Sequence, residues 1–156
     1  MMCVKDQEAR YKVIEQQVSD EILLNIDSEH LPILKSIVDD YGWPGYNLIG
    51  EDGADMFWLL IQHCDQDLEF QKKCLELLKN AVASQDAPKK HLAYLTDRVL
   101  VNSGEDQLYG TQATSDNGIV LSSISDPDHL DERRRDMELC PIDEYLTLLN
   151  EVYLRP

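Results

Sequence analysis

The segment from Gly50 to Cys64, GEDGADMFWLLIQHC, constrains the fold of this chain more than any other stretch. Its middle, residues 54–61, carries apolar side chains on nearly every side of a helical wheel rather than along one stripe. A helix with this pattern is expected where neighbouring elements cover it all round. We therefore predict a mainly α-helical fold, a single-domain bundle with this buried helix at its centre.

The predicted central helix ends at Gln62 and His63, two side chains with hydrogen-bonding groups. Such groups cost roughly 1 to 3 kcal/mol when they are buried without partners, so another group must face them. The acids Glu51 and Asp52 lie just before the helix, where its dipole favours negative charge. We interpret them as capping residues, and the identity of the group that faces His63 is the main functional question.

Composition limits the classes of protein to which the chain can belong. Its 156 residues fit one domain, 1–156, large enough to bury a core without disulfides. The 14 Lys and Arg against 30 Asp and Glu give a net charge of -16, which repels nucleic-acid phosphate. We expect no nucleic-acid partner; the acidic surface either keeps the protein soluble or docks onto a basic protein partner.

The location of the protein is predicted from its N-terminus, its hydropathy and its cysteines. The first residues, MMCVKDQEARYKV, lack the apolar run of a signal peptide, and no stretch approaches the roughly 18 apolar residues of a membrane span. The four cysteines show no CxxC pair and no zinc-site spacing with histidine. We expect a soluble cytoplasmic protein with reduced thiols, no membrane contact and no metal.

Apolar residues at helical spacing predict further helices on both sides of the central one. Pro32 is tolerated only in the first turn of a helix, so the second helix should start no earlier than Ser28, and Gly42 should end it. Trp43 after it is interpreted as a core plug. The predicted ranges are 4–18, 28–41, 68–84, 88–102, 127–137 and a last helix starting at Pro141.

A β-hairpin is predicted near residues 107–124, where the helical period stops. Two strand-like runs, 108–114 and 119–124, flank the sequence Ser-Asp-Asn-Gly, and Asn-Gly between such runs is a strong hairpin signal. An isolated hairpin is only marginally stable in water, so this one should pack on the helices. Gly110 in the first strand would allow another element or a ligand to approach closely.

Polar residues gather on the helix at 88–102 and on the first strand of the hairpin. Tyr94, Asp97 and Arg98 share one flank of the helix, because they are three and four residues apart. Such a group forms either a structural network or a site. The arginine run 133–135 also has two interpretations. These residues either pair with acids at a helix end, or they contact an anion or a partner.

The chain contains the pieces GWP at 42–44, GEDGA at 50–54 and further short motifs up to the end of the chain. In these pieces it resembles a widespread bacterial domain family without an established function. Their order and spacing cover nearly the whole chain. One departure is His30, where the family pattern has asparagine three residues after Asp27. The resemblance implies no reaction. The other matching residues are Gln62, His63, Asp65, Phe70, Gln71, Tyr94, Leu95, Asp97, Arg98, 109–112, 131–134, Pro141, Tyr145 and Leu146.

Two functional hypotheses follow. In the first, His63 and Arg98 are catalytic residues of a pocket in a hydrolase or transferase that acts on a small anionic substrate. His63 transfers the proton and Arg98 holds the anion. No nucleophile motif, dinucleotide-binding motif or Walker loop supports it, and no cofactor is expected. The residues predicted to bind the ligand are Gln62, Tyr94, Asp97, Tyr109 and Gln112.

In the second hypothesis the protein is an acidic interaction module, an inhibitor or effector without catalytic activity, and the same polar residues satisfy one another. Metal binding through His63 and carboxylates is a third, weaker alternative. A solvent-connected cavity between His63 and Arg98 would favour the pocket, whereas burial of both against protein acceptors would favour the network.

Overall fold

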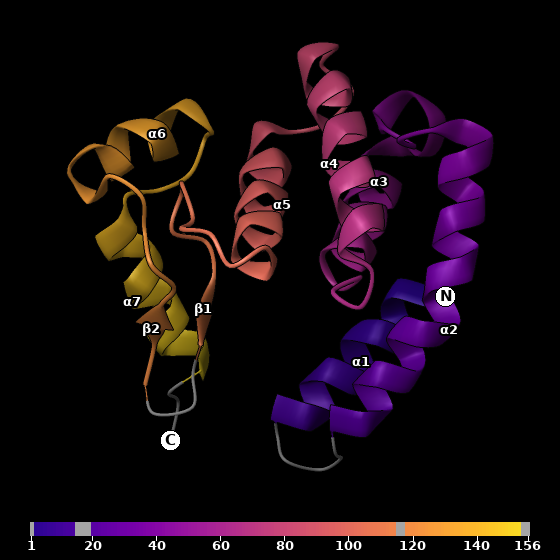
Figure 1. The fold of residues 1–156 in the computed structure, drawn as a ribbon, viewed down its shortest axis with the longest axis horizontal. Coiled ribbons are helices and arrows are strands. Elements are labelled where there is room, and N and C mark those ends of the chain that lie inside the picture. The colour runs from indigo at the N-terminus through magenta and orange to yellow at the C-terminus, as the bar shows by residue number, and fades with distance from the viewer. Residues whose placement is uncertain (1, 15–19, 115–117, 154–156) are drawn as a thin grey trace. The chain divides into compact units, whose positions relative to one another are not determined.

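The computed structural model describes residues 2–14, 20–114 and 118–153 of the chain, and these residues form a mainly α-helical fold with one small antiparallel hairpin (Figure 1). The predicted fold class is therefore confirmed. The α-helices are α1 (Met2–Ile14), α2 (Asp20–Tyr41), α3 (Tyr46–Gln62), α4 (Leu68–Ala83), α5 (Lys89–Asn102), α6 (Leu130–Asp136) and α7 (Ile142–Tyr153). The other elements are β1 (Ala113–Thr114), β2 (Val120–Leu121) and the 3-10 helix η1 (Pro127–His129).

These elements divide into two compact units, residues 1–87 with α1 to α4 and residues 88–156 with the remainder. Each unit has its own buried apolar residues, such as Leu34, Ile61 and Leu78 in the first and Leu95 and Leu130 in the second. The assignment of residues 1–156 to a single domain stays a prediction. Among the described helices, none combines the length and the apolar character that a bilayer crossing requires.

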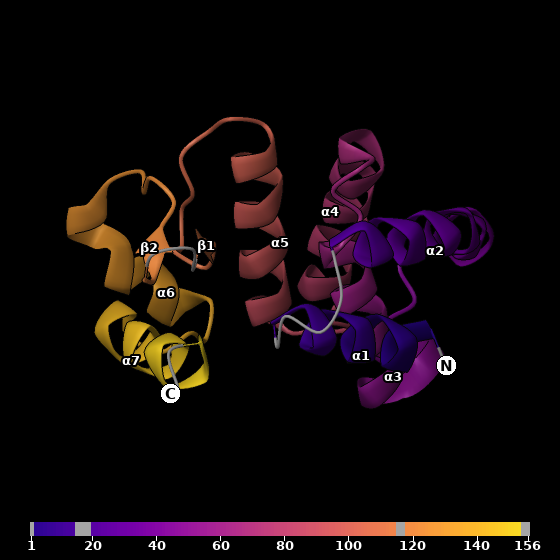
Figure 2. The same cartoon turned by 90° about the horizontal axis from the view of Figure 1, so that it is seen from below.

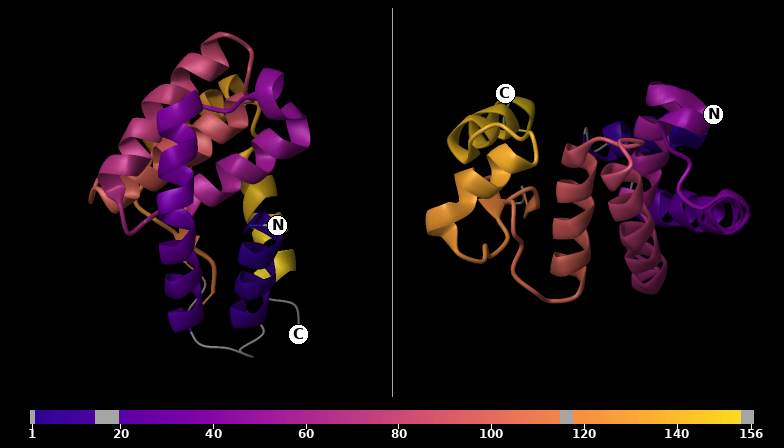
Figure 3. Two further views of the ribbon diagram at one scale, coloured as in Figure 1. Left: turned by 90° about the vertical axis from the view of Figure 1, so that its right-hand side faces the viewer. Right: turned by 90° about the horizontal axis from the view of Figure 1, so that it is seen from above.

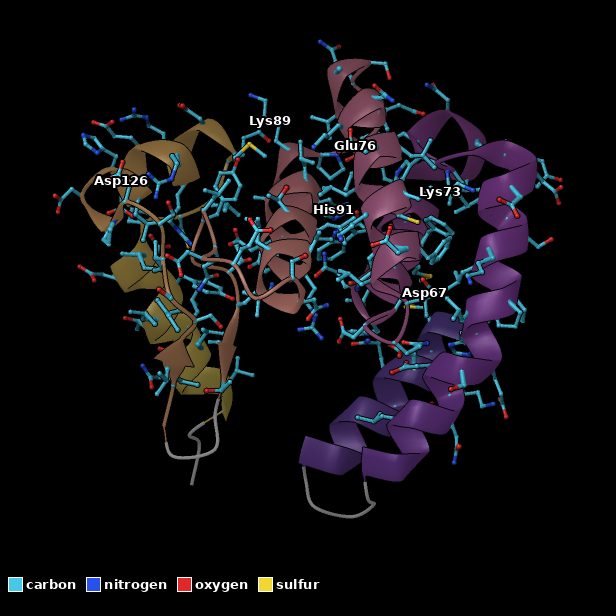
Figure 4. The ribbon with its side chains drawn as sticks, viewed as in Figure 1. Asp67, Lys73, Glu76, Lys89, His91 and Asp126 are labelled. Atoms are coloured by element: carbon cyan, nitrogen blue, oxygen red, sulfur yellow. The ribbon has the colours of Figure 1, made fainter. Side chains whose placement is uncertain are left out.

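In the first unit, α1 and α2 lie side by side and run antiparallel, and α3 contacts both α1 and α4 (Figures 1 and 3). Ion pairs also join α2 to α4: Lys35 Nζ lies 2.5 Å from Asp67 Oδ2, and Lys73 Nζ lies 2.7 Å from Asp39 Oδ1. Figure 4 labels Lys73 on α4 and Asp67, the N-cap residue just before it. The link between α3 and α4, residues 63–67, is as short as those that join neighbouring helices in bundles.

The predicted start of the second helix at Ser28 is wrong, because α2 begins at Asp20 and carries Pro32 in its interior. Proline there removes one backbone hydrogen bond and normally breaks or kinks a helix. Pro32 itself is exposed, whereas Ile26, His30, Leu34 and Val38 are buried at intervals of four residues. This continuous buried stripe holds the helix on both sides of the proline. The helix ends as predicted, with Gly42 at φ 68°.

The central helix α3 starts earlier than predicted and is kinked. Gly50 has φ 73° and ψ 173°, so residues 46–49 form a separate first turn and Glu51 and Asp52 begin the main helical segment. Asp86 caps the first turn: its carbonyl accepts from Tyr46 N (3.0 Å) and its carboxylate from Asn47 N (2.8 Å).

The core around α3 contains the predicted aromatic plug. Trp43 is buried and its ring meets the Phe57 ring edge to face, with centroids 5.3 Å apart. The Trp43 Nε1 atom is buried without a hydrogen-bond partner. Burial of α3 is nevertheless incomplete, since Leu48, Ile49 and Met56 are exposed.

In the second unit, the predicted hairpin is present but its ladder is short. Ala113 pairs with Leu121 and Thr114 with Val120, and a parallel bridge joins Gln107 to Ile124. Figure 2 shows β1 and β2 beside each other. Residues 115–117 of the predicted turn lie outside the described residues, as do residues 15–18 of the first predicted helix. The last helices follow the prediction, with η1 and α6 after Asp126 and α7 after Pro141.

The kink in α3 requires a backbone conformation at Gly50 that a substitution can test. Its φ and ψ values fall in a region that only glycine adopts freely, at a cost of about 1 to 3 kcal/mol for other residues. We therefore expect Gly50→Ala to lower the free energy of unfolding by about that amount in urea titrations followed by circular dichroism. Met56→Ala, at an exposed position in the same helix, is the control and should change it by less than about 0.5 kcal/mol. Equal stability of the two variants would contradict the kink.

Candidate functional site

His63 lies at the corner between α3 and α4, as the C-cap residue of α3. Its backbone N–H donates to the Leu60 carbonyl at 3.1 Å, which closes the last turn of the helix. Asp67 then caps α4 by accepting from Phe70 N at 3.0 Å. The corner is therefore fixed by backbone hydrogen bonds on both sides, and the imidazole projects from a rigid position.

The partner that His63 requires is Asp6 of α1. The Nδ1 atom of His63 lies 3.0 Å from Asp6 Oδ2, and the same carboxylate oxygen accepts from Gln7 Nε2 at 2.7 Å. Asp6 is fully buried, while the His63 side chain is 17% exposed. A carboxylate at Nδ1 fixes the tautomer and orientation of an imidazole and directs Nε2 away from the pair. Sequence reasoning missed Asp6, because no spacing relates it to His63, 57 residues away.

The buried Gln71 of α4 binds the carbonyls at the end of α3. Its Nε2 atom lies 3.2 Å from the Ile61 carbonyl, 3.3 Å from the Gln62 carbonyl and 3.2 Å from Asp65 Oδ1. The last carbonyls of a helix have no partner within the helix, so this amide replaces water there. Gln62 itself is buried, and its backbone takes part in this arrangement. The resemblance pointed to Gln71, but periodicity did not.

His30 of α2 is a second buried imidazole in the same unit. It is 5% exposed, and its Nδ1 atom has no hydrogen-bond partner. Lys5 of α1 pairs with Glu29 of α2 at 2.8 Å. Because the two helices are antiparallel, the next residue of each, Asp6 and His30, turns about 100° to the same side of the helix pair. His30 therefore belongs to the side of α1 and α2 that carries Asp6, the partner of His63.

In the second unit, the buried carboxylate of Asp97 binds a stretch of backbone. It accepts from Leu108 N at 2.8 Å, from Tyr109 N at 3.1 Å and from Thr111 N at 2.9 Å, and also from the Thr111 hydroxyl at 2.9 Å. Gln107 binds the same stretch, since its side chain exchanges hydrogen bonds with the backbone of Gln112. These side chains take the place of a partner strand, which explains why the predicted strand 108–114 forms only two ladder pairs.

The arginine run binds the carbonyls of the same stretch. Arg133 Nε donates to the Leu108 carbonyl at 2.8 Å, and the buried Arg134 donates through Nη1 to the Tyr109 carbonyl and through Nε to the Cys140 carbonyl. Arg133 Nη1 also lies 3.5 Å from an Asp126 carboxylate oxygen. Pairing with acids is therefore a minor part of what Arg133 does, and Arg134 is a structural residue.

Arg98 also has a partner in its own unit. Its Nη1 atom donates to Gln112 Oε1 at 3.0 Å, and Gln112 Nε2 donates to the Thr111 hydroxyl at 3.1 Å. The Tyr94 ring meets the Tyr145 ring edge to face, with centroids 6.4 Å apart. Burial raises the pKa of Tyr94, and burial together with the nearby Asp97 raises the pKa of Tyr109. Both phenols are therefore protonated at neutral pH.

The predicted site residues thus fall into two groups. Gln62 and His63 lie in the first unit, with Asp6 and Gln71 around them. Tyr94, Asp97, Arg98, Tyr109 and Gln112 lie in the second unit, where they form one network with the stretch 107–112. The joint pocket of His63 and Arg98 stays a prediction.

The chain matches the model of a family described as "Family of unknown function (DUF6624)" over residues 4–155. The chain belongs to this family. The resemblance found in the sequence, to a domain family without an established function, is thereby confirmed. No curated protein and no solved structure matches the chain.

Two further observations concern the metal-ligating and nucleophilic side chains of the described residues. Among residues 2–14, 20–114 and 118–153, no group of three or more His, Cys, Asp and Glu side chains is arranged to hold a metal ion. Burial raises the pKa of the Cys64 and Cys74 thiols to about 12. Both thiols are protonated at neutral pH and are poor nucleophiles.

The role of Asp97 predicts a large effect of a small substitution. Asp97→Asn keeps the shape but turns an NH₂ group toward backbone donors, so we expect the free energy of unfolding to fall by about 2 to 4 kcal/mol. Hydrogen exchange should show loss of protection at the amides of Leu108, Tyr109 and Thr111. The exposed Asp106→Asn is the matched control and should leave both readouts unchanged. Retained protection in Asp97→Asn would contradict the assigned hydrogen bonds.

The raised pKa values of Cys64 and Cys74 predict slow alkylation in the native state. With a pKa of about 12, roughly one thiol in ten thousand is ionised at pH 8, and this fraction grows as the pH rises toward 12. Iodoacetamide at pH 8 should therefore modify the partly exposed Cys140 well before Cys64 and Cys74, as read by mass spectrometry of peptides. In urea all four cysteines should react alike. Rapid native modification of Cys64 would show that the thiol is not buried.

Proposed function

We propose that the protein performs acid–base chemistry through His63, with Asp6 as its positioning residue. The observation that carries this proposal is the contact between His63 Nδ1 and the fully buried Asp6 carboxylate, 3.0 Å apart. Asp6 is the one hydrogen-bond partner of the His63 ring within the described part of the chain, so Nε2 is left for a substrate. A base oriented by a third group is the arrangement by which enzymes activate a hydroxyl or water.

Burial of Asp6 gives the pair its chemical value. A carboxylate removed from water is costly unless charged or hydrogen-bonded groups compensate it, and here Gln7 and His63 do so. When His63 takes a proton from a substrate or water, the adjacent carboxylate stabilises the imidazolium that forms. The rigid corner at the end of α3 keeps the ring in one orientation for this step.

His30 extends the proposed site. An imidazole nitrogen buried without a partner costs about 1 to 3 kcal/mol, and such groups in native proteins call for a bound water, ion or ligand. His30 Nδ1 is such an atom, on the side of the α1 and α2 pair that carries Asp6. We assign it to hydrogen bonding with the ligand of the His63 site.

The substrate class in this proposal is a small anion, handled by a hydrolase or transferase. The proposed anion clamp is Arg98, whose guanidinium is oriented by Gln112 at 3.0 Å, with Tyr94, Tyr109 and Asp97 around the same stretch of backbone. Arg98 and the ligand-binding residues of its unit stay part of the proposal. Their observed hydrogen bonds also serve the fold, so their variants need a stability control.

The alternative function is an acidic interaction module without catalysis. A specific observation favours it: exposed apolar residues and exposed acids occur together on α3, which contains no lysine or arginine. This alternative needs no free Nε2 on His63, so the two functions make different demands on that atom.

The test compares His63→Gln with Asp6→Asn in a turnover screen on nitrophenyl esters and nitrophenyl phosphates. We expect His63→Gln to lower kcat/KM by about a hundredfold or more, which is the usual contribution of a positioned general base. Asp6→Asn should lower it as well, because the tautomer of His63 is no longer fixed. Lys5→Gln, next to Asp6 but exposed, is the control.

A second readout keeps the proposal testable if the screen contains no substrate. Nitrogen resonances of His63 should report the Nδ1–H tautomer in the native protein and move when inorganic phosphate or acetate is added. The ring should lose the preference for that tautomer in Asp6→Asn. No turnover, no response of His63 to either anion and a large loss of melting temperature in both variants would show that the pair is only structural.

A further inference from the structure

The outer side of α3 between Asn47 and Met56 exposes large apolar side chains. Leu48 is 56% exposed, Ile49 41% and Met56 47%. Single exposed apolar residues are normal on protein surfaces, but a group of them within ten residues is the usual mark of a binding surface. We call residues 47–56 the outer α3 face.

The absence of a side chain at Gly53 leaves room for Ile49 on this face. A Cβ atom placed on Gly53 would lie 3.1 Å from Ile49 Cβ, so the Ile49 side chain lies directly over Gly53. Met56 follows Gly53 by three residues and shares its side of the helix. Ile49 belongs to the first turn of α3, just before the kink at Gly50.

The charges on the outer α3 face all have one sign. Glu51, Asp52 and Asp55 are exposed there, and α3 contains no lysine or arginine. An occupant must therefore offer apolar groups for Ile49 and Met56 together with positive charges for the acids.

Charge also decides between the possible occupants. A second copy of this chain would bring the same three acids against themselves, since a two-fold interface joins identical patches, and the net charge of -16 adds to this repulsion. Anionic lipid headgroups and nucleic-acid phosphates are repelled for the same reason. A cationic protein segment is attracted.

We propose that the outer α3 face binds an amphipathic helix with an apolar stripe flanked by lysine and arginine. Such a helix lays its apolar side on an apolar surface and reads the flanks through charge pairs. Leu48, Ile49 and Met56 supply the apolar contact, and Glu51 and Asp52 supply the charge pairs. This inference is independent of the acid–base proposal, because it rests on residues other than His63 and Asp6.

The probe for the test is a synthetic 18-residue helical peptide of leucine and lysine with all leucines on one side. Two control peptides are a scrambled peptide of the same composition and a leucine–glutamate peptide with the same stripe. Fluorescence anisotropy should show binding of the first peptide at least about tenfold tighter than binding of either control, and affinity should fall as salt screens the charges.

Substitutions locate the binding on α3. Ile49→Lys and Met56→Lys should each weaken binding by at least about tenfold, because each removes a buried apolar contact and adds a like charge. Ile33→Lys on α2 is the matched control, since Ile33 is 48% exposed and lies outside the face, and it should bind normally. All three positions are exposed, and circular dichroism should confirm that the variants fold.

Three results would overturn the proposal. Equal affinity for the helical and the scrambled peptide would show that attraction of charges alone is measured. Equal binding by Met56→Lys and Ile33→Lys would place the binding elsewhere on the molecule. Self-association in sedimentation experiments that Met56→Lys abolishes would identify a second copy of the chain as the occupant.

Discussion

The second unit depends on the binding of one stretch of backbone, residues 107–112, by buried side chains of opposite charge. Asp97 accepts the N–H groups of this stretch, while Arg133 and Arg134 donate to its carbonyls. Backbone groups buried outside regular structure must find partners, and here charged side chains provide them instead of a neighbouring strand. The hairpin, α5, α6 and, through the bond from the Tyr145 hydroxyl to the Thr111 carbonyl, α7 are thereby held around one segment.

The first unit solves the same problem at the ends of its helices. Asp86 binds the first N–H groups of α3, Gln71 binds its last carbonyls, and Asp67 caps α4. In each case a polar side chain from outside the helix, or from the residue before it, replaces water at a group that the helix cannot satisfy itself. The acidic residues of this chain are therefore partly structural, and the net charge of -16 overstates how many carboxylates are free to meet a partner.

These structural roles help to distinguish residues that hold the fold from residues of the candidate site. The hydrogen-bonding groups of Asp97, Arg134 and Gln107 are largely taken up by the backbone. In the other pair, Asp6 orients the His63 ring through Nδ1 and does not occupy Nε2. The buried Nδ1 of His30 is the other polar atom in this unit, besides the Trp43 indole, that lacks a partner among the described residues. The candidate site thus differs from the network in its hydrogen bonding. The buried polar groups of the network have partners, whereas a buried atom near the candidate site lacks one.

Local patterns determined much of the fold. Apolar periodicity placed α4 and α5 nearly at their observed limits, the glycine after Tyr41 ended α2, and Asn-Gly located the hairpin, because each of these signals acts within a few residues. The same reasoning failed at Pro32 and along residues 108–112. At both places the buried stripe of α2 or the carboxylate of Asp97, which lie across the structure, outweighed the local preference.

The sequence by itself also singled out His63, Asp97 and Arg98 as candidate site residues, but not what each of them meets. The pairing of His63 with Asp6, 57 residues away, and the exposure of Met56 on a helix that reads as apolar all round were decided by tertiary packing alone. Spacing along a chain shows which side chains share one helix face, whereas the partner from another helix depends on how the helices pack.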